Sequence, residues 1–176
     1  TMAQPVKVNE VFIGAANWIE IKNAGSAAVT LTGWRAMAYK NGQLIVNYAF
    51  PNGFTLPAGG YVLLAEGTSG SGLAVQPLLY LGTRINWTAA DGGAVALTSA
   101  SGAGADFVRW GCCTSPPPSG TSWLGDDPPA PDGVQSLARK WNIDTDRGSD
   151  WNHQSASPAA DNAITEFKVF VPLVVR

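Results

Sequence analysis

Short stretches in which apolar and polar residues alternate recur along this chain and predict β-strands. In residues 17–22, Ile19 and Ile21 share one phase of the alternation, as in a strand with one buried face. Residues 6–13 alternate in the same way, and a phase slip at Asn9-Glu10 predicts a β-bulge. We expect further strands at residues 29–32, 34–39, 44–50, 61–65, 78–81, 94–99, 106–110, 137–141 and 167–175.

Turn-forming residues separate these stretches at short intervals. Asn41-Gly42 is the strongest local signal, because both residues tolerate the positive φ of a type I′ hairpin turn. Residues 67–72 contain only Gly, Ser and Thr and predict a flexible loop. Many short strands with frequent turns are typical of a β-sandwich, so we predict an all-β protein built as one antiparallel sandwich.

Three regions depart from this pattern. Residues 112–133 are rich in proline and predict a long loop of the kind that often carries function. The loop begins with adjacent cysteines, Cys112 and Cys113, for which two semi-buried thiols and a vicinal disulfide both fit the sequence. Residues 142–162 are polar and predict a further loop. Residues 164–176 predict an edge strand or a tail, since a proline interrupts them.

The composition favours strands over helices and argues against two classes of partner. Charged residues make up 14% of the chain, and the helix formers Lys and Glu are sparse. The net charge is −2 and no basic run exceeds the pair Arg139-Lys140. The sequence therefore predicts no cluster of Lys and Arg that could neutralise nucleic-acid phosphates and release their counterions. The longest apolar stretch is broken by Lys168 and Pro172 and is shorter than the about 20 residues of a membrane span. We therefore expect neither a nucleic-acid partner nor a membrane span.

Four segments of the chain resemble the lamin tail domain, a family with an immunoglobulin-like β-sandwich fold. The segments occur in the family's order, and such a set is far more specific than one short motif. They are Val8-Asn9-Glu10-Val11 with residues 17–23, residues 29–34, residues 54–64, and residues 92–97 with 106–111, continuing through 136–139 to 157–162. Within residues 156–162 the chain lacks a glycine of the family pattern.

This resemblance implies a non-catalytic module, which in bacteria occurs in secreted and cell-surface proteins. It implies a lamin tail domain over residues 1–163, with the proline-rich loop at 112–133, followed by a tail or edge strand at 164–176. We accordingly expect an extracellular or cell-surface location and a protein or cell-surface partner that binds the loops.

The motif residues have structural roles in this interpretation. Asn9, Glu10 and Glu20 are expected to hydrogen-bond to backbone groups of strand ends and loops, which would otherwise be unpaired. Gly33 allows a close backbone approach beside Trp34, whose large ring fills the core. The remaining motif residues are Trp18 and Asn23.

No set of reactive residues predicts catalysis. A Ser or Cys nucleophile would need a base, and the only histidine, His153, lies in the polar stretch. Asp144, Asp146 and Asp150 are spaced like the start of a calcium loop, but its twelfth position is Ser155 instead of a bidentate Glu. The other acids give no spacing that selects a catalytic pair; those weighed are Glu10, Glu20, Glu66 and Asp91. We therefore predict no enzyme activity, no metal site and no cofactor.

Tryptophans supply an alternative function. The chain has seven, and exposed aromatic rings are one means by which sandwiches bind sugars. Trp87 and Trp123 lie in loop-like sequence and are the candidates for binding a polysaccharide. The alternative prediction is therefore a carbohydrate-binding sandwich.

Overall fold

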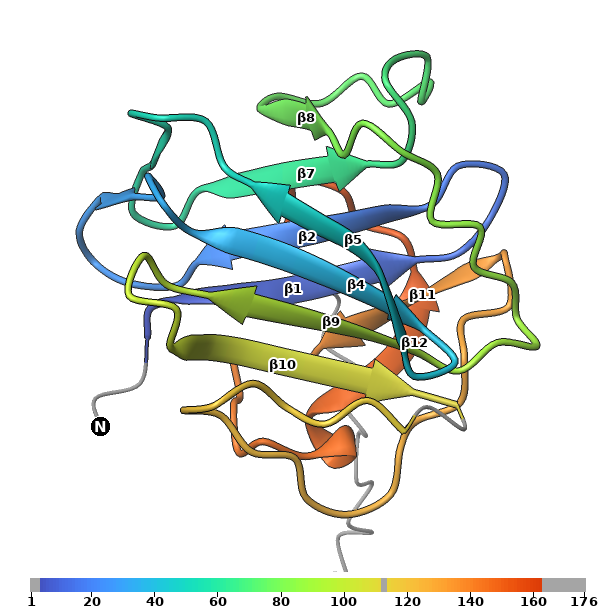
Figure 1. Ribbon diagram of the computed structural model, residues 1–176. Coiled ribbons are helices and arrows are strands. Elements are labelled where there is room, and N and C mark those ends of the chain that lie inside the picture. Colours follow the sequence, from blue (N-terminus) through green and yellow to red (C-terminus); the bar gives the residue numbers. More distant parts are fainter. Residues whose placement is uncertain (1–3, 112–113, 163–176) are drawn as a thin grey trace, which may run out of the picture.

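Two β-sheets face each other in the computed structural model, which describes residues 4–111 and 114–162 (Figure 1). The larger sheet has six strands, in the spatial order β12 (Trp151–Ser155), β11 (Gln135–Arg139), β1 (Val6–Phe12), β2 (Trp18–Asn23), β7 (Tyr61–Ala65) and β8 (Leu78–Tyr80). The smaller sheet has four, in the order β10 (Gly104–Trp110), β9 (Gly93–Thr98), β4 (Arg35–Lys40) and β5 (Gln43–Ala49). A short two-stranded sheet joins β3 (Val29–Thr30) to β6 (Thr55–Leu56).

Every strand pair is antiparallel except the parallel pair of β7 and β8. The described residues also contain one 3₁₀ turn, η1 (Gly148–Asp150). No helix within residues 4–111 and 114–162 has the length and hydropathy that crossing a membrane requires. The predicted all-β sandwich is confirmed.

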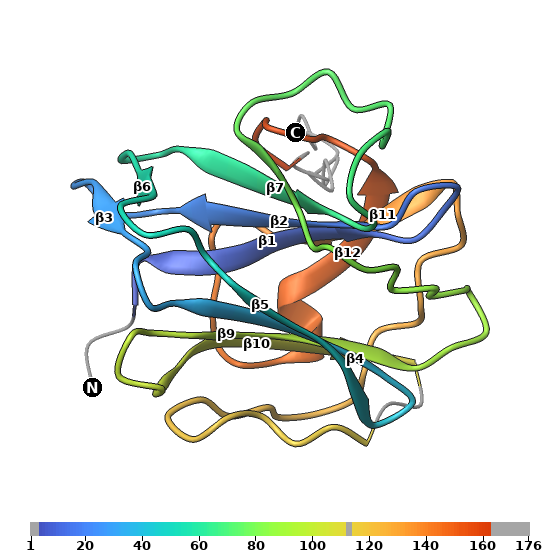
Figure 2. The same cartoon turned by 45° about the horizontal axis from the view of Figure 1, so that its top comes forward.

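The apolar phase of each strand forms the core between the two large sheets, which Figure 2 shows as separate layers. Val8 and Ile21 from the six-stranded sheet are fully buried, as are Val95 and Val108 from the four-stranded sheet. Burying side chains of this size stabilises the fold by roughly 1.5–3 kcal/mol each. Alternation therefore leaves the opposite phase of β1 and β2 on the outer face, where polar residues gather.

Two local predictions are confirmed. The pairing of β1 with β2 shifts register between Val8 and Glu10, as a β-bulge requires. Asn41 has φ 48° and Gly42 has φ 83°, so both central residues of the β4–β5 hairpin adopt the left-handed conformation.

The predicted polar loop at residues 142–162 is partly wrong, because β12 lies within it. This strand pairs along its whole length with β11, with Trp151 opposite Arg139. Trp151 is 4% exposed, and the centroid of its ring lies 4.5 Å from the guanidinium carbon of Arg139. The sequence of β12 has no β-branched alternation, so its extended form comes from tertiary packing and not from local pattern.

Some predictions fall on residues outside the described part of the chain. These are the strand predicted at 167–175, the tail or edge strand at 164–176, and the two alternatives for Cys112 and Cys113.

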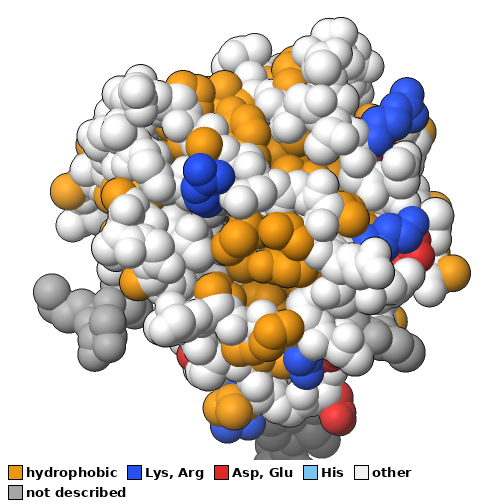
Figure 3. Space-filling view, viewed as in Figure 1, with side chains coloured by type: hydrophobic (Ala, Val, Ile, Leu, Met, Phe, Trp, Pro, Cys, Tyr) orange, Lys and Arg blue, Asp and Glu red, His pale blue; other side chains and the backbone are white. Residues whose placement is uncertain are grey.

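The proline-rich loop packs against the outer face of β10. The Trp123 ring meets the Phe107 ring edge to face at 5.9 Å, and Arg109 Nε donates to Asp127 Oδ1 at 2.8 Å. Next to this contact, Met37 and Tyr39 pack on the same outer face, and Figure 3 shows hydrophobic side chains gathered over the middle of the four-stranded sheet. Backbone hydrogen bonds from Gly104 to Ser119 and from Gly111 to Pro128 add to this ring contact and this ion pair in anchoring the loop to the sandwich.

Asn23 joins the end of β2 to the two-stranded sheet. Its buried side chain donates from Nδ2 to three carbonyl oxygens, with distances of 2.8 Å to Ala27, 3.0 Å to Leu56 and 3.1 Å to Pro57. Its Oδ1 accepts from the backbone N–H of Gly25 at 3.0 Å.

Replacing Asn23 with alanine is expected to lower the free energy of unfolding by about 2 kcal/mol, because buried carbonyls lose their donors. Denaturant unfolding monitored by circular dichroism measures the change. Asn47→Ala is the matched control, since the exposed Asn47 side chain accepts a hydrogen bond from the exposed Arg35 side chain, and it should cost less than about 0.5 kcal/mol. Equal losses in the two variants would contradict this role.

Candidate functional site

Two buried carboxylates lie side by side on the outer face of the six-stranded sheet. Glu10 of β1 is the register partner of Glu20 of β2, and both residues are fully buried. No sequence spacing selects these two acids, because the register between β1 and β2 brings them together. The other acids weighed with them have separate partners: Glu66 Oε2 accepts from Asn17, and Asp91 Oδ2 accepts from Thr88.

Hydrogen bonds from a later segment of the chain occupy the Glu10 and Glu20 carboxylates. Glu10 accepts from the Ser136 hydroxyl and, at 3.0 Å, from the backbone N–H of Ser157. Glu20 accepts from Asn9 Nδ2 at 2.7 Å and from the backbone N–H of Ala159 at 2.6 Å. The pair thereby fastens residues 157–159 onto the sheet and is closed to a substrate.

Burial changes the acidity of both carboxyl groups. It raises the pKa of Glu10, against hydrogen bonds from Ser136 and Ser157 that lower it. It raises the pKa of Glu20 to about 7, against the hydrogen bonds from Asn9 and Ala159, and the nearby charge of Glu10 adds to the rise. Protonation of Glu20 near neutral pH is therefore linked to folding.

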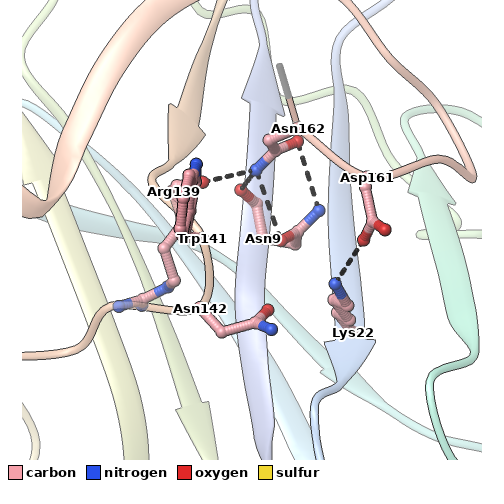
Figure 4. Close-up of a pocket in the computed structure, with 7 residues that line it drawn as sticks. All are labelled: Asn9, Lys22, Arg139, Trp141, Asn142, Asp161 and Asn162. Carbon is pink, nitrogen blue, oxygen red and sulfur yellow. Dashed lines mark hydrogen bonds and ion pairs between the residues drawn. The ribbon is translucent and has the colours of Figure 1, made fainter. Parts of the chain in front are cut away.

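A pocket of about 260 Å³ opens next to this pair (Figure 4). Its walls come from β1, β2, the end of β11, the turn that follows β11, and the segment after β12. The lining residues are Asn9, Lys22, Arg139, Trp141, Asn142, Asp161 and Asn162.

Hydrogen bonds between distant segments fix one side of the pocket. Asn162 Nδ2 donates to the backbone oxygen of Asn9 at 3.0 Å and to that of Arg139 at 2.8 Å. Lys22 Nζ lies 2.6 Å from Asp161 Oδ1, which also accepts from the Tyr61 hydroxyl. These bonds tie the segment after β12 to four strands of the sheet, β1, β2, β7 and β11.

A tight turn forms the opposite side of the pocket. Trp141 and Asn142 are its central residues, with φ 49° and 61°, and the N–H of Ile143 donates to the Lys140 oxygen at 2.7 Å. Trp141 is 59% exposed. The strand predicted at 137–141 therefore ends at Arg139. Trp141, predicted as its last residue, is instead an exposed aromatic side chain beside a polar pocket.

The Arg139 side chain turns away from the pocket and joins the two sheets. Its guanidinium, which is buried, lies 2.6 Å from Asp106 of β10 and 3.1 Å from Asp144. Its Nε donates to the Val8 oxygen at 2.9 Å. This network closes the edge of the sandwich where β1 meets β10.

The three aspartates considered for calcium do not converge. Asp144 pairs with Lys7 and Arg139, Asp146 accepts from Ser122, and Asp150 accepts from Thr145. In the part of the chain that the structure describes, no three His, Cys, Asp or Glu residues are grouped so that they could hold a metal ion.

The two tryptophans proposed for sugar binding are not free platforms. Trp87 is 3% exposed, and its Nε1 donates to the backbone oxygen of Tyr39 at 2.9 Å. The expectation of an exposed Trp87 ring is therefore wrong. Trp123 is half-buried on Phe107, and its Nε1 donates to Asp127 at 2.7 Å. The loop sequences around them gave no sign that tertiary contacts bury these rings.

The remaining candidates occupy structural positions. Trp18 is buried on the outer face and stacks on Phe12 at 5.6 Å, while Trp34 is buried in the core. Gly33 has φ 78°, and a Cβ there would lie 3.0 Å from the Ala100 Cβ. His153 lies in β12, with Nε2 3.1 Å from the Pro129 oxygen.

Comparison with known proteins identifies the first two-thirds of this architecture. Residues 1–112 match the family model described as Lamin Tail Domain. No curated protein matches the chain. The match includes β1 to β10, whereas β11, β12 and the pocket turn lie beyond it.

Proposed function

Because the chain belongs to the lamin tail domain family, whose immunoglobulin-like module is non-catalytic, we propose that it is an extracellular structural and binding module. Its loops would present a surface to a protein or cell-surface partner. We also propose that the domain continues to residue 163, beyond the family match, since β11 pairs directly with β1.

Exposed aliphatic side chains after the family match are the observation that carries this proposal. Among the described residues, five large hydrophobic side chains are exposed, and four of them lie between residues 124 and 143. Three are aliphatic: Leu124 at 48%, Val134 at 78% and Ile143 at 45%. Exposed apolar side chains that lie together are typical of protein contact surfaces, and we propose that these three contribute to one.

The proposal that the whole chain is non-catalytic is supported by how its candidate reactive groups are used. Glu10 and Glu20 have their oxygens engaged by Ser136, Ser157, Asn9 and Ala159 in a fully buried position. A general acid or base must reach a substrate proton within hydrogen-bond distance, which this burial prevents.

The proposed location outside the cell follows from the resemblance to lamin tail domains of secreted and surface proteins. Brief protease treatment of intact host cells, followed by immunoblotting for the chain, tests it. Loss of the signal while a cytoplasmic marker remains, or recovery of the chain from the culture fluid, supports the proposal. A chain that is protected until the cells are lysed contradicts it.

Replacing Leu124 with serine is expected to abolish binding of the protein or cell-surface partner, because an exposed apolar side chain at the contact is exchanged for a polar one. Crosslinking of the purified chain to native culture fluid or intact cells, followed by identification of the crosslinked species, measures the loss. Leu44→Ser is the matched control, since Leu44 is 49% exposed but lies on β5.

The proposal predicts a partner that crosslinks to the wild type and to Leu44→Ser and is depleted at least about tenfold with Leu124→Ser. If the same species are recovered in equal amounts with all three proteins, the loop surface is not the contact site and the proposal fails.

A further inference from the structure

Trp141 is an aromatic platform held in a fixed position. Two adjacent residues other than glycine in the left-handed conformation are strained, and such strain persists only where surrounding bonds enforce it. Here the backbone N–H of Lys140 donates to the backbone oxygen of Asp150 at 2.8 Å. Arg139 Nη1 donates to the backbone oxygen of Ile143 at 2.9 Å. The turn therefore presents the ring to solvent without the entropy cost of ordering a mobile loop.

Polar groups with unused hydrogen-bonding capacity face the same pocket. The Asn142 amide has no hydrogen-bond partner within the described residues, and Figure 4 shows it directed between Trp141 and Lys22. Asp161 has an 82% exposed side chain, and its Oδ1 bonds to Lys22 and Tyr61, which leaves Oδ2 as an acceptor. An amide and a carboxylate together supply donors and acceptors at one opening.

The charges around the pocket are balanced. Lys22 is paired with Asp161, and the Arg139 guanidinium is paired with Asp106 and Asp144. An anionic or cationic ligand would therefore meet no excess of the opposite charge. A neutral ligand that offers hydroxyl groups on its edge and C–H groups on its face fits these walls best.

We propose that this pocket binds one ring of a neutral carbohydrate, with the sugar face on Trp141 and sugar hydroxyls bonded to Asn142 and Asp161. The pocket volume of about 260 Å³ is slightly below the about 300 Å³ at which pockets for drug-sized ligands begin, so it suits one ring of a longer glycan. The site does not include Leu124, although Ile143 of the proposed protein contact follows Asn142 in the pocket turn.

Isothermal titration of the full chain with four neutral oligosaccharides tests the site: cellotetraose, xylotetraose, maltotetraose and tetra-N-acetylchitotetraose. At least one should bind. Trp141→Ala should weaken that binding at least about tenfold, while Trp141→Phe, which keeps an aromatic face, should lose less than about threefold. Asn142→Ala should weaken it several-fold.

Leu44→Ala is the control for loss of an exposed apolar side chain, and it should bind like the wild type. Thermal unfolding of each variant separates a lost contact from a lost fold. The proposal is overturned if none of the four sugars binds, if folded Trp141→Ala binds as tightly as the wild type, or if tetragalacturonate, an anionic glycan, binds more tightly than every neutral one. Leu124→Ser should retain sugar binding, so failure of the loop proposal and failure of this site give different results.

Discussion

Arg139→Met is expected to lower the free energy of unfolding by about 3–5 kcal/mol, as found when one partner of a buried ion pair is removed. The guanidinium is 2% exposed and Asp106 is buried on the facing sheet, so the variant leaves an uncompensated carboxylate inside the sandwich. The Val8 oxygen also loses its side-chain donor. Guanidinium chloride unfolding followed by tryptophan fluorescence measures the loss.

Arg35→Ala removes an exposed arginine from the neighbouring sheet and serves as the control, with an expected change below about 0.5 kcal/mol. The double variant Arg139→Met/Asp106→Asn should recover at least about 2 kcal/mol relative to Arg139→Met, because the buried charge is gone. A loss below about 1 kcal/mol for Arg139→Met, or no recovery in the double variant, would show that the ion pair does not hold the sheets together.

The protein is expected to become less stable as pH rises from 4.5 to 7, because of Glu20. Burial raises the pKa of this carboxyl from 4.5 to about 7, so the folded protein binds a proton that the unfolded chain has released in this range. Its contribution to stability is complete below pH 4.5 and is lost as pH rises to about 7. The shift corresponds to about 3 kcal/mol, and the raised pKa of Glu10 acts in the same direction.

Urea unfolding at pH 4.5, 6, 7 and 8 measures this dependence. Glu20→Gln should flatten most of the decline, since glutamine does not titrate. Glu66→Gln is the control of opposite sign: hydrogen bonds from Asn17 and Ile85 lower the pKa of Glu66, although partial burial opposes them, so its contribution is lost only as pH falls below 4.5. A wild type whose stability is constant from pH 4.5 to 8, or a decline that persists unchanged in Glu20→Gln, would contradict the assignment.

Much of the sandwich could be predicted because its signals are local. The alternation in residues 17–22 determines which side chains of β2 enter the core, and Asn41-Gly42 determines the β4–β5 hairpin. Even the bulge at Asn9-Glu10 is visible as a phase slip. Each of these depends on a few consecutive residues and on the two-residue period of a strand.

The pocket could not be predicted because contacts between distant residues create it. Asn9 and Asn162 meet only after the segment beyond β12 folds back over the sheet. The sequence predicts Trp141 at the end of a strand and Trp87 in a loop, yet a turn exposes the first and the core buries the second. Sequence analysis predicts the exposure of a tryptophan from its neighbours along the chain, whereas its actual exposure depends on its neighbours in space.

The pairing of the first long strand with a strand near the other end of the chain has a consequence for biosynthesis. The bond from Arg139 to the Val8 oxygen spans 131 positions, and β1 lies between β2 and β11 in the sheet. On a translating ribosome, one edge of β1 therefore stays unpaired until β11 has emerged. Late pairing of β1 with β11 slows folding, and until then the unpaired edge of β1 can pair with strands of other nascent chains.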